Sequence, residues 1–319
     1  MDDPAVPSTA ATRRDARPPP IRLLVLDIDG TVTDTRHEVP TATRRAVRAV
    51  LDAGIRVMLA TGRRYRDALP VARTLGLDAP LVTASGALVK SPVDHATLHR
   101  AGFAKGVLER ALATVVAAGH EPIVYSDRYA DGFDFYCRRL TVATTTDDGV
   151  LAEYLARNAE VARVYPDLHA TPPPDVFAGF AMGSREAMAS LEADLHAACP
   201  AALSLHTLRS PRYRHWMCEI APATVTKWSA VAAVAETWGI TPQEICAAGD
   251  DVNDLPMIEA SGLGIAMGNA RPEVLVAADR VVGTNDGGGI GDIAELLIAR
   301  LAQSAPSSDG AGKSGRSTA

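Results

Sequence analysis

The sequence contains few cysteines, no excess of positive charge and no long uncharged hydrophobic run. Its four cysteines, Cys137, Cys199, Cys218 and Cys246, are scattered over 319 residues, without the spacing of a metal site and too few to staple a chain of this length. We therefore expect reduced thiols and a cytoplasmic location. No window approaches about 18 uncharged apolar residues, so no membrane span is predicted. The first residues also lack the apolar stretch of a secretory signal.

The charge balance argues against a nucleic-acid partner. The chain has 32 Lys and Arg against 38 Asp and Glu, a net charge of −6, whereas binding to a phosphate backbone depends on clustered basic side chains. Apolar residues make up 47% of the chain, enough for a sizeable core. Residues 1–20 and 304–319 are rich in small and polar residues, and we predict that both tails are disordered. The sequence does not indicate an oligomeric state.

The first part of the chain alternates between strand and helix signals. Apolar runs at 23–26, 55–60 and 80–83 are separated by segments with helical periodicity. Such alternation is typical of a doubly wound, parallel α/β sheet, in which each crossover is a helix. The same pattern resumes after residue 224, with a helix to 238, a strand at 245–248, a helix after 254, and short strands at 262–267 and 280–283.

Between these two stretches the pattern changes to that of an α+β module. Helical periodicity is found at 107–116 and 184–198, and strand signals at 122–125, 133–137, 176–182, 203–208 and 213–220. We therefore predict a core domain formed by residues 21–88 and 222–303, with an α+β cap domain, residues 89–221, inserted into it. A cleft between two such domains is a common place for a ligand.

Acidic motifs follow two of the apolar runs, far apart in the sequence. Asp27-Ile28-Asp29-Gly30-Thr31 follows the first strand, and Gly249-Asp250-Asp251-Val252-Asn253-Asp254 follows the strand near residue 245. The carboxyl ends of parallel strands meet at one crevice, where α/β sheets bind ligands. Paired carboxylates there can divide nucleophilic attack and proton transfer between them. Their accumulated negative charge calls for a cation, and oxygen ligands without His or Cys favour Mg²⁺.

These motifs resemble those of the haloacid dehalogenase superfamily of phosphotransferases. The resemblance rests on Asp27-Ile28-Asp29-Gly30-Thr31, Ala60-Thr61-Gly62-Arg63, Lys227 and Gly249–Asp254, in this order. Gly264-Ile265-Ala266-Met267-Gly268-Asn269-Ala270 and Asp286-Gly287 extend it to the Cof-like hydrolases with a type IIB cap. It covers about residues 21–301, the cap by length and pattern. Ser85-Gly86 departs from the Asn-Gly that is common in Cof-like members.

The resemblance implies a role for each motif residue. Asp27 would be the nucleophile and a metal ligand, Asp29 would transfer protons and offer its backbone carbonyl to the metal, and Asp250 would be the third ligand. Thr61, Gly62, Lys227 and Asn253 would hold the phosphoryl group, and Asp254 would orient Lys227 or a metal-bound water. The second acid, Asp29, is typical of phosphatases and phosphomutases, whereas transport ATPases of the superfamily have Thr at that position.

Taken one at a time, several of these residues also have structural interpretations. Asp27, Asp29 and Thr61 are common helix-cap and turn residues, and Lys227 alone would be read as a solvated lysine. A lysine is however unfavourable in the first turn of a helix, because of the helix dipole, and this favours a functional role. Gly287–Gly291 lacks the βαβ context of a dinucleotide-binding loop. For the cap we weigh packing against substrate recognition by Arg138, Arg139, Arg212, Arg214 and His215.

We thus predict a Mg²⁺-dependent phosphatase that acts on a small phosphorylated metabolite, such as a sugar phosphate, through an aspartyl-phosphate at Asp27. The alternatives are a phosphomutase on the same scaffold and a sugar-phosphate binding protein without turnover. A regulatory role of the two tails is a further possibility. The sequence does not identify the substrate, because selectivity would depend on the cap.

Overall fold

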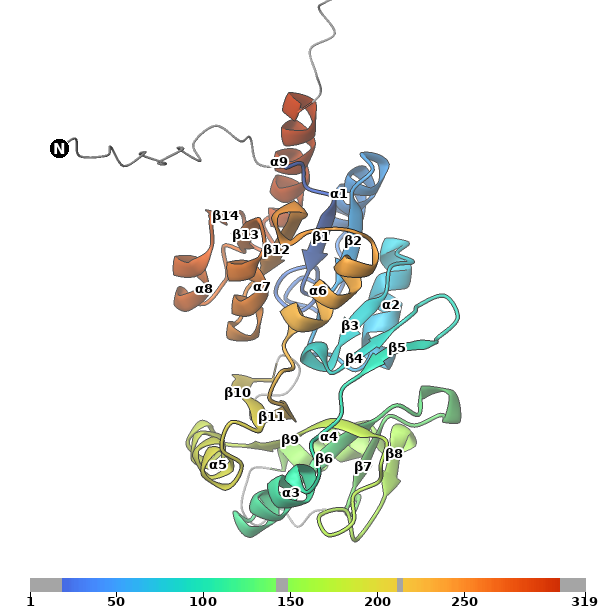
Figure 1. Ribbon diagram of the computed structural model, residues 1–319, viewed down its shortest axis with the longest axis vertical. Helices are drawn as coiled ribbons and strands as arrows, with labels where there is room; N and C mark the ends of the chain where they lie inside the picture. Colours follow the sequence, from blue (N-terminus) through green and yellow to red (C-terminus); the bar gives the residue numbers. More distant parts are fainter. Residues whose placement is uncertain (1–18, 142–148, 211–214, 305–319) are drawn as a thin grey trace, which may run out of the picture.

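The computed structural model describes residues 19–141, 149–210 and 215–304. It contains a five-stranded sheet, a six-stranded sheet and a three-stranded sheet (Figure 1). We call the part with the five-stranded sheet the core, and the part with the six-stranded sheet and helices α3 to α5 the cap. Most of the two predicted tails, and Arg212 and Arg214, lie outside the described residues.

The core sheet is parallel throughout, in the order β14-β13-β12-β1-β2. Its central strand β1 has apolar side chains on both faces, and all of them are buried. Leu24 and Leu26 pack in one cluster with α1 and α9, whereas Leu23 and Val25 pack in another with α6. Because helices cover both faces, the predicted doubly wound α/β architecture is confirmed. The strands are β1 (Leu23–Leu26), β2 (Arg56–Leu59), β12 (Ile245–Gly249), β13 (Leu263–Ala266) and β14 (Arg280–Val281).

Helices of the core follow the strands as crossovers. They are α1 (Thr41–Asp52), α2 (Tyr65–Leu75), α6 (Lys227–Thr237), α7 (Leu255–Ala260), α8 (Pro272–Ala277) and α9 (Gly289–Ser304). Helix α6 begins with a capping box, in which the Thr226 hydroxyl accepts from the Ser229 amide and the Ser229 hydroxyl accepts from the Thr226 amide. This capping box fixes the first residue of the helix, Lys227, where the chain re-enters the core after cap strand β11 (Trp216–Pro222).

The third predicted strand differs from expectation in its pairing. Strand β3 (Leu81–Thr83) belongs to the small antiparallel sheet with β4 (Leu88–Lys90) and β5 (Thr97–Arg100). It also lies parallel to the end of β2, through a bridge between Ala60 and Val82 and a hydrogen bond from the Thr61 amide to the Val82 carbonyl. The short turn Ala84–Gly86 sends the chain back antiparallel after three residues, so β3 pairs with β4 as well.

The cap is a mixed sheet with helices on it. Its strand order is β10-β11-β9-β6-β7-β8, antiparallel except for the pair β7 and β8. The strands are β6 (Ile123–Ser126), β7 (Phe135–Cys137), β8 (Ala162–Val164), β9 (Val176–Gly183), β10 (Leu203–Arg209) and β11 (Trp216–Pro222), and the helices are α3 (Val107–Ala117), α4 (Val150–Arg157) and α5 (Arg185–Ala198). The separate α+β cap is thereby confirmed, while the limits of the two predicted domains stay predictions.

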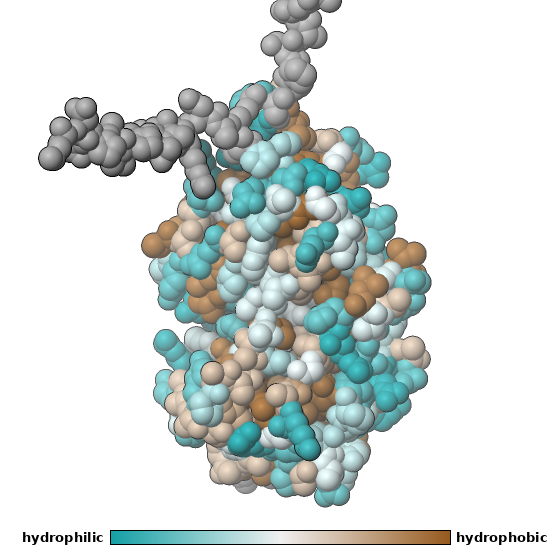
Figure 2. Space-filling view, viewed as in Figure 1, coloured by the Kyte–Doolittle hydropathy of each residue, from teal (hydrophilic) through white to brown (hydrophobic). Residues whose placement is uncertain are grey.

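The surface carries no large hydrophobic patch on the face shown in Figure 2, where hydrophilic and hydrophobic residues alternate. Val93, Leu98 and Val276 are exposed apolar side chains, which are common on folded proteins. Within the described residues, no helix combines the length and the apolar character needed to span a bilayer. All four cysteines are buried and free.

Candidate active site

Three parallel strands end side by side, and their ends carry the predicted site residues. The Asp27 amide continues the ladder by donating to the Ala248 carbonyl at 3.1 Å, and the Ala60 amide donates to the Leu26 carbonyl at 2.9 Å. Asp27, Thr61 and Asp250 therefore follow neighbouring strands at one edge of the core sheet.

Lys227 bridges two of the acidic side chains. Its Nζ donates to Asp27 Oδ1 at 2.7 Å and to Asp254 Oδ1 at 2.6 Å, and all three residues are buried. The other oxygen of Asp254, Oδ2, accepts from the backbone amides of Asp250 and Asp251. Both carboxylate oxygens of Asp254 are thus engaged, which fits the predicted role of orienting Lys227. Burial opposes the charge of Lys227, but Asp254 and Asp27 outweigh it and raise its pKa, so the ammonium stays protonated.

The carboxylates at this edge repel one another. Burial, together with the charges of Asp254 and Asp29, raises the pKa of Asp27 to about 7, against the opposing pull of Lys227. Burial, Asp27 and Asp254 raise the pKa of Asp250 to about 9. One ammonium group is therefore not enough to neutralise the site, which favours uptake of a further cation or of protons.

A hard divalent cation fits this donor set. Single carboxylate oxygens of Asp27, Asp250 and Asp254 lie within 4.8 Å of one another, and oxygen-only donors suit Mg²⁺. Asp250 is itself held by Thr31, whose hydroxyl donates to Oδ1 at 3.3 Å, and by Asn269, whose Nδ2 lies 3.4 Å from Oδ2. These contacts of Asp250 are longer than those of Asp254 with Lys227 and two backbone amides, at 2.6 to 3.1 Å, so Asp27 and Asp250 are the better ligands of the three.

Asp29 is paired with an arginine. Arg63 donates from Nε to Asp29 Oδ2 at 2.7 Å and from Nη2 to Asp29 Oδ1 at 2.6 Å, and His37 Nδ1 lies 3.3 Å from Oδ1. A two-point guanidinium–carboxylate contact fixes the plane as well as the position of the acid. In this structure both oxygens of Asp29, the residue with the predicted proton-transfer role, thus accept hydrogen bonds from Arg63.

The predicted phosphate-binding residues lie beside these acids. Thr61 is buried, its amide donates to the Val82 carbonyl, and its hydroxyl accepts from the Arg63 amide at 3.1 Å. A Cβ atom placed on Gly62 would lie 3.8 Å from Asn253 Nδ2. The structure therefore brings Gly62 close to Asn253, and Thr61 follows the strand beside that of Asp27.

Three of the predicted cap residues have partners within the cap. Arg139 and Arg138 reach Glu121 at 3.2 and 3.7 Å, and His215 Nδ1 lies 3.4 Å from the Gly183 carbonyl. A role of Arg138, Arg139 and His215 in substrate recognition stays a prediction.

Sequence reasoning gave no role to three residues of the site. Arg63 and Asn269 stand inside the motifs, and Asn269 also donates to the Gly30 carbonyl at 2.8 Å. Glu219 comes from cap strand β11, and its Oε2 accepts from Ser85 Oγ at 2.8 Å. The Thr-Gly-Arg order at a strand end could have pointed to Arg63, but nothing in the sequence places Glu219 at the core.

The family of the chain follows from comparison with known proteins. The model of the haloacid dehalogenase-like hydrolases matches residues 24–293. The chain belongs to this family. Similar proteins include the phosphatase YwpJ of Bacillus subtilis, 25% identical over 87% of this chain and 100% of its own length. A phosphoglycolate phosphatase of Methanoculleus marisnigri is 26% identical over 82% of this chain and 90% of its own.

Solved structures of this family share the fold of the whole chain. A subclass IIB sugar phosphatase, BT4131, superposes with a TM-score of 0.69 at 20% identity, covering 86% of this chain and 98% of its own. The core with an inserted cap is therefore a fold that this chain shares with a subclass IIB sugar phosphatase.

Proposed function

We propose that this haloacid dehalogenase-like hydrolase is a Mg²⁺-dependent phosphatase that releases phosphate from a small phosphorylated metabolite, such as a sugar phosphate, through an aspartyl-phosphate at Asp27. The observation that supports it most is the bridging of Asp27 and Asp254 by buried Lys227, 2.7 and 2.6 Å away, beside Asp250. Phosphoryl transfer requires mainly positioning and neutralisation of charge, and this arrangement supplies both. The names of relatives, phosphatases among them, agree with the proposal.

In the first step Asp27 attacks the phosphorus of the ester. Lys227 binds one oxygen of Asp27, Oδ1, so Oδ2 forms the new O–P bond while the bond from phosphorus to the leaving oxygen breaks. Asp29 gives its proton to that oxygen, and an alcohol leaves. Thr61, Gly62 and Asn253 hold the phosphoryl oxygens, with Lys227 as the fixed positive charge. Mg²⁺, bound by Asp27, Asp250 and the Asp29 carbonyl, would lower the negative charge that repels the nucleophile from the ester.

In the second step a water hydrolyses the aspartyl-phosphate. Asp29, now ionised, takes a proton from the water, the water oxygen bonds to phosphorus, and the bond to Asp27 breaks to release phosphate. The contact with Arg63 favours the ionised form of Asp29 and keeps it oriented for this step. The negative charge of the bound phosphoryl group favours the protonated form of Asp29, which helps Asp29 to hold its proton until the first step.

The test is phosphate release from p-nitrophenyl phosphate by the full chain with Mg²⁺. We expect Asp27→Asn and Asp29→Asn to lower kcat by about 100-fold or more, as loss of a nucleophile or an acid–base group does. Arg48→Gln, which removes an exposed ion pair with Asp52 on α1, is the matched control and should leave kcat unchanged. Full activity of Asp27→Asn would contradict the covalent step. Transfer of the phosphoryl group to another hydroxyl, without free phosphate, would indicate a phosphomutase.

A further inference from the structure

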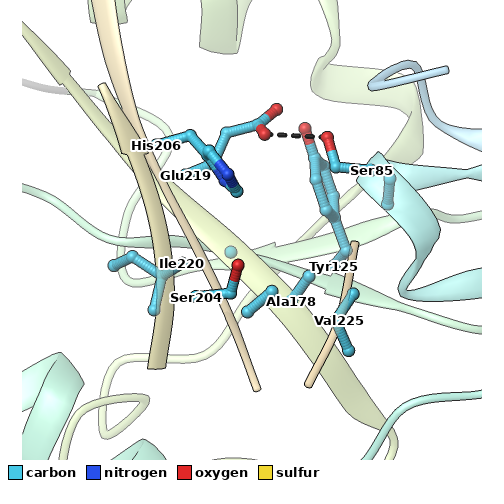
Figure 3. A pocket seen from close by; sticks show the side chains of 11 residues that line it. Ser85, Tyr125, Ala178, Ser204, His206, Glu219, Ile220 and Val225 are labelled. Atoms are coloured by element: carbon cyan, nitrogen blue, oxygen red, sulfur yellow. Dashed lines mark hydrogen bonds between the residues drawn. The ribbon is translucent and has the colours of Figure 1, made fainter. Parts of the chain in front are cut away.

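A pocket between core and cap opens next to the proposed phosphate site. It is lined from the core by Ser85 and Val225, and from the cap by Tyr125, Ser204, His206 and Glu219. Figure 3 shows the Glu219 carboxylate, the Tyr125 hydroxyl and the Ser85 hydroxyl at the same end of this pocket. In this structure the pocket has room for about one water-sized group, which suits a hydroxyl group of the leaving group next to the phosphoryl group.

Glu219 is a cap residue that lies close to Gly62, one of the proposed phosphate-binding residues. A Cβ atom on Gly62 would lie 3.4 Å from Glu219 Oε1 and 3.4 Å from Ser85 Oγ. The carboxylate is held by the Ser85 hydroxyl at 2.8 Å and by its place on β11, opposite His206 on β10. Burial raises the pKa of Glu219 above its ordinary value, against the opposing effects of His206, the Ser85 hydrogen bond and Lys227.

The polar groups of the pocket suit hydroxyl groups better than a second anion. They are the Ser85, Ser204 and Tyr125 hydroxyls, the His206 imidazole and the Glu219 carboxylate. No Lys or Arg is among the described residues that line this pocket. A carboxylate accepts hydrogen bonds from hydroxyl groups and repels another carboxylate. A buried acceptor also disfavours ligands that leave it unpaired.

We propose that Glu219 is a specificity-determining residue, which accepts hydrogen bonds from hydroxyl groups of a neutral polyol leaving group and excludes phosphate esters that carry a carboxylate near the ester. This proposal rests on the proposed phosphatase function and narrows its substrate class to phosphorylated polyols and sugars. It sets this chain apart in substrate from its relative that is named a phosphoglycolate phosphatase.

The experiment compares two esters of one carbon frame, sn-glycerol 3-phosphate and 3-phosphoglycerate, which differ in a CH₂OH group against a carboxylate. The readout is the ratio of their kcat/KM values, or of their inhibition constants against p-nitrophenyl phosphate where turnover is slow. We expect the wild-type ratio to favour glycerol phosphate by about 10-fold or more, since hydrogen bonds to charged groups are among the stronger ones.

Three substitutions in the cap separate the causes. Glu219→Gln keeps the shape but removes the charge, and we expect it to reduce the ratio by about 10-fold. Glu219→Asp keeps the charge but moves the carboxylate away from the ligand, because the side chain is shorter by one CH₂ group. This variant should still reject 3-phosphoglycerate, and it should turn over glycerol phosphate more slowly. Glu186→Gln, at an exposed position of cap helix α5, is the matched control and should retain the wild-type ratio. Circular dichroism confirms that each variant is folded.

The outcomes distinguish this proposal from the proposed function. If wild type releases phosphate from p-nitrophenyl phosphate but Glu219→Gln keeps the wild-type ratio within about twofold, the role of Glu219 is wrong and the phosphatase function stands. If wild type prefers 3-phosphoglycerate, the assigned substrate class is wrong. If wild type with Mg²⁺ releases phosphate from no ester, both proposals fail.

Discussion

At the scale of single residues, the site concentrates more negative charge than its one buried ammonium group neutralises. Lys227 contacts Asp27 and Asp254, and Asp250 adds its charge from the neighbouring strand end. The result is a raised pKa at both Asp27, about 7, and Asp250, about 9. In the unfolded chain these carboxyl groups are separated and titrate near 3.8. The folded state should therefore be least stable when these carboxyl groups are deprotonated and no metal is bound.

This imbalance predicts how stability changes with pH when metal is removed. Between the unfolded value of 3.8 and the folded values of about 7 and about 9, the folded state binds more protons than the unfolded state. Stability should therefore fall as pH rises through this window. The two shifts together span several pKa units, each worth about 1.4 kcal/mol, so we expect a total loss of up to roughly 10 kcal/mol. The measurement is the Tm in EDTA from pH 5 to pH 9.

Mg²⁺ should reverse this trend, because metal binding requires deprotonated ligands and strengthens with pH. We expect the gap between Tm with Mg²⁺ and Tm in EDTA to widen as pH rises. Asp250→Asn removes one of the repelling charges and one ligand, so this variant should show a flatter profile and a smaller response to Mg²⁺. A Tm in EDTA that increases from pH 6 to pH 9 would contradict this prediction.

Three other carboxyl groups, those of Asp34, Asp94 and Glu244, have a lowered pKa. They change the stability of the protein only in acid, outside the tested pH range.

At the scale of elements, glycines allow segments to approach closely around the site. Gly30 has φ of +77°, and a Cβ there would lie 2.2 Å from Asp250 Oδ2, so the loop after β1 can pass the end of β12 only without a side chain. Gly86 plays the same part between the turn after β3 and the start of α6. Its φ is +103°, and a Cβ there would lie 2.1 Å from the Thr226 carbonyl oxygen. Thr226 is the N-cap that fixes Lys227.

Gly86→Ala should therefore displace the start of helix α6 and, with it, the Lys227 ammonium. We expect a loss of roughly 2–4 kcal/mol of stability, from the strained φ and the backbone overlap, and a fall in kcat of about 10-fold or more because the site depends on sub-ångström positioning. Urea unfolding and steady-state kinetics measure the two effects.

Gly54→Ala is the matched control for this change. Gly54 also has a positive φ, +84°, but a Cβ there would meet nothing within 4 Å. It should cost only about 1–2 kcal/mol for the left-handed conformation and leave kcat unchanged. Equal effects of the two substitutions on kcat would show that the contact between Gly86 and Thr226 does not position Lys227.

Element type could be predicted from the sequence wherever a strong local pattern decides it. The uninterrupted apolar run at β1 indicates a strand buried on both faces, and the structure buries all four of its residues. The antiparallel pairing of β3 with β4 could not be predicted in this way. Its apolar run resembles those of the parallel strands, and the partner is decided by the turn at Ala84–Gly86, where Ser85 adopts a φ of +53°. Such a turn depends on tertiary contacts more than on residue type.

The same division applies to the site. Residues at the ends of parallel strands, such as Asp27 and Asp250, could be placed together because topology alone brings the ends to one edge. Glu219 could not, because its position depends on how cap strand β11 lies over the core, 134 residues along the chain from its partner Ser85. The pairing of Asp29 with Arg63 depends likewise on side-chain geometry that a motif does not carry.

At the scale of the whole molecule, function depends on how the cap sits on the core. Helix α2 of the core reaches the cap through two arginines. Arg66 Nε donates to both oxygens of Asp134, at 3.0 and 2.9 Å, and Arg64 Nη1 lies 3.6 Å from Asp134. Arg64 also donates to Asn158 Oδ1 at 2.7 Å. Asp134 is buried, so its charge is screened little by solvent, and the contact is a stronger link than a surface ion pair.

Asp134→Asn should loosen this link. The substitution keeps the size of the side chain but leaves the Arg64 and Arg66 cations facing a neutral group, so we expect a loss of about 1–3 kcal/mol in the free energy of unfolding. The radius of gyration from small-angle X-ray scattering should increase, and KM should rise more than kcat falls, because Glu219 is carried by the cap whereas Asp27 and Lys227 belong to the core. Asp131→Asn removes an exposed ion pair with Arg128 inside the cap, and as the matched control it should change none of these quantities. Scattering curves and KM values of Asp134→Asn that coincide with those of wild type would mean that other contacts hold the cap in place.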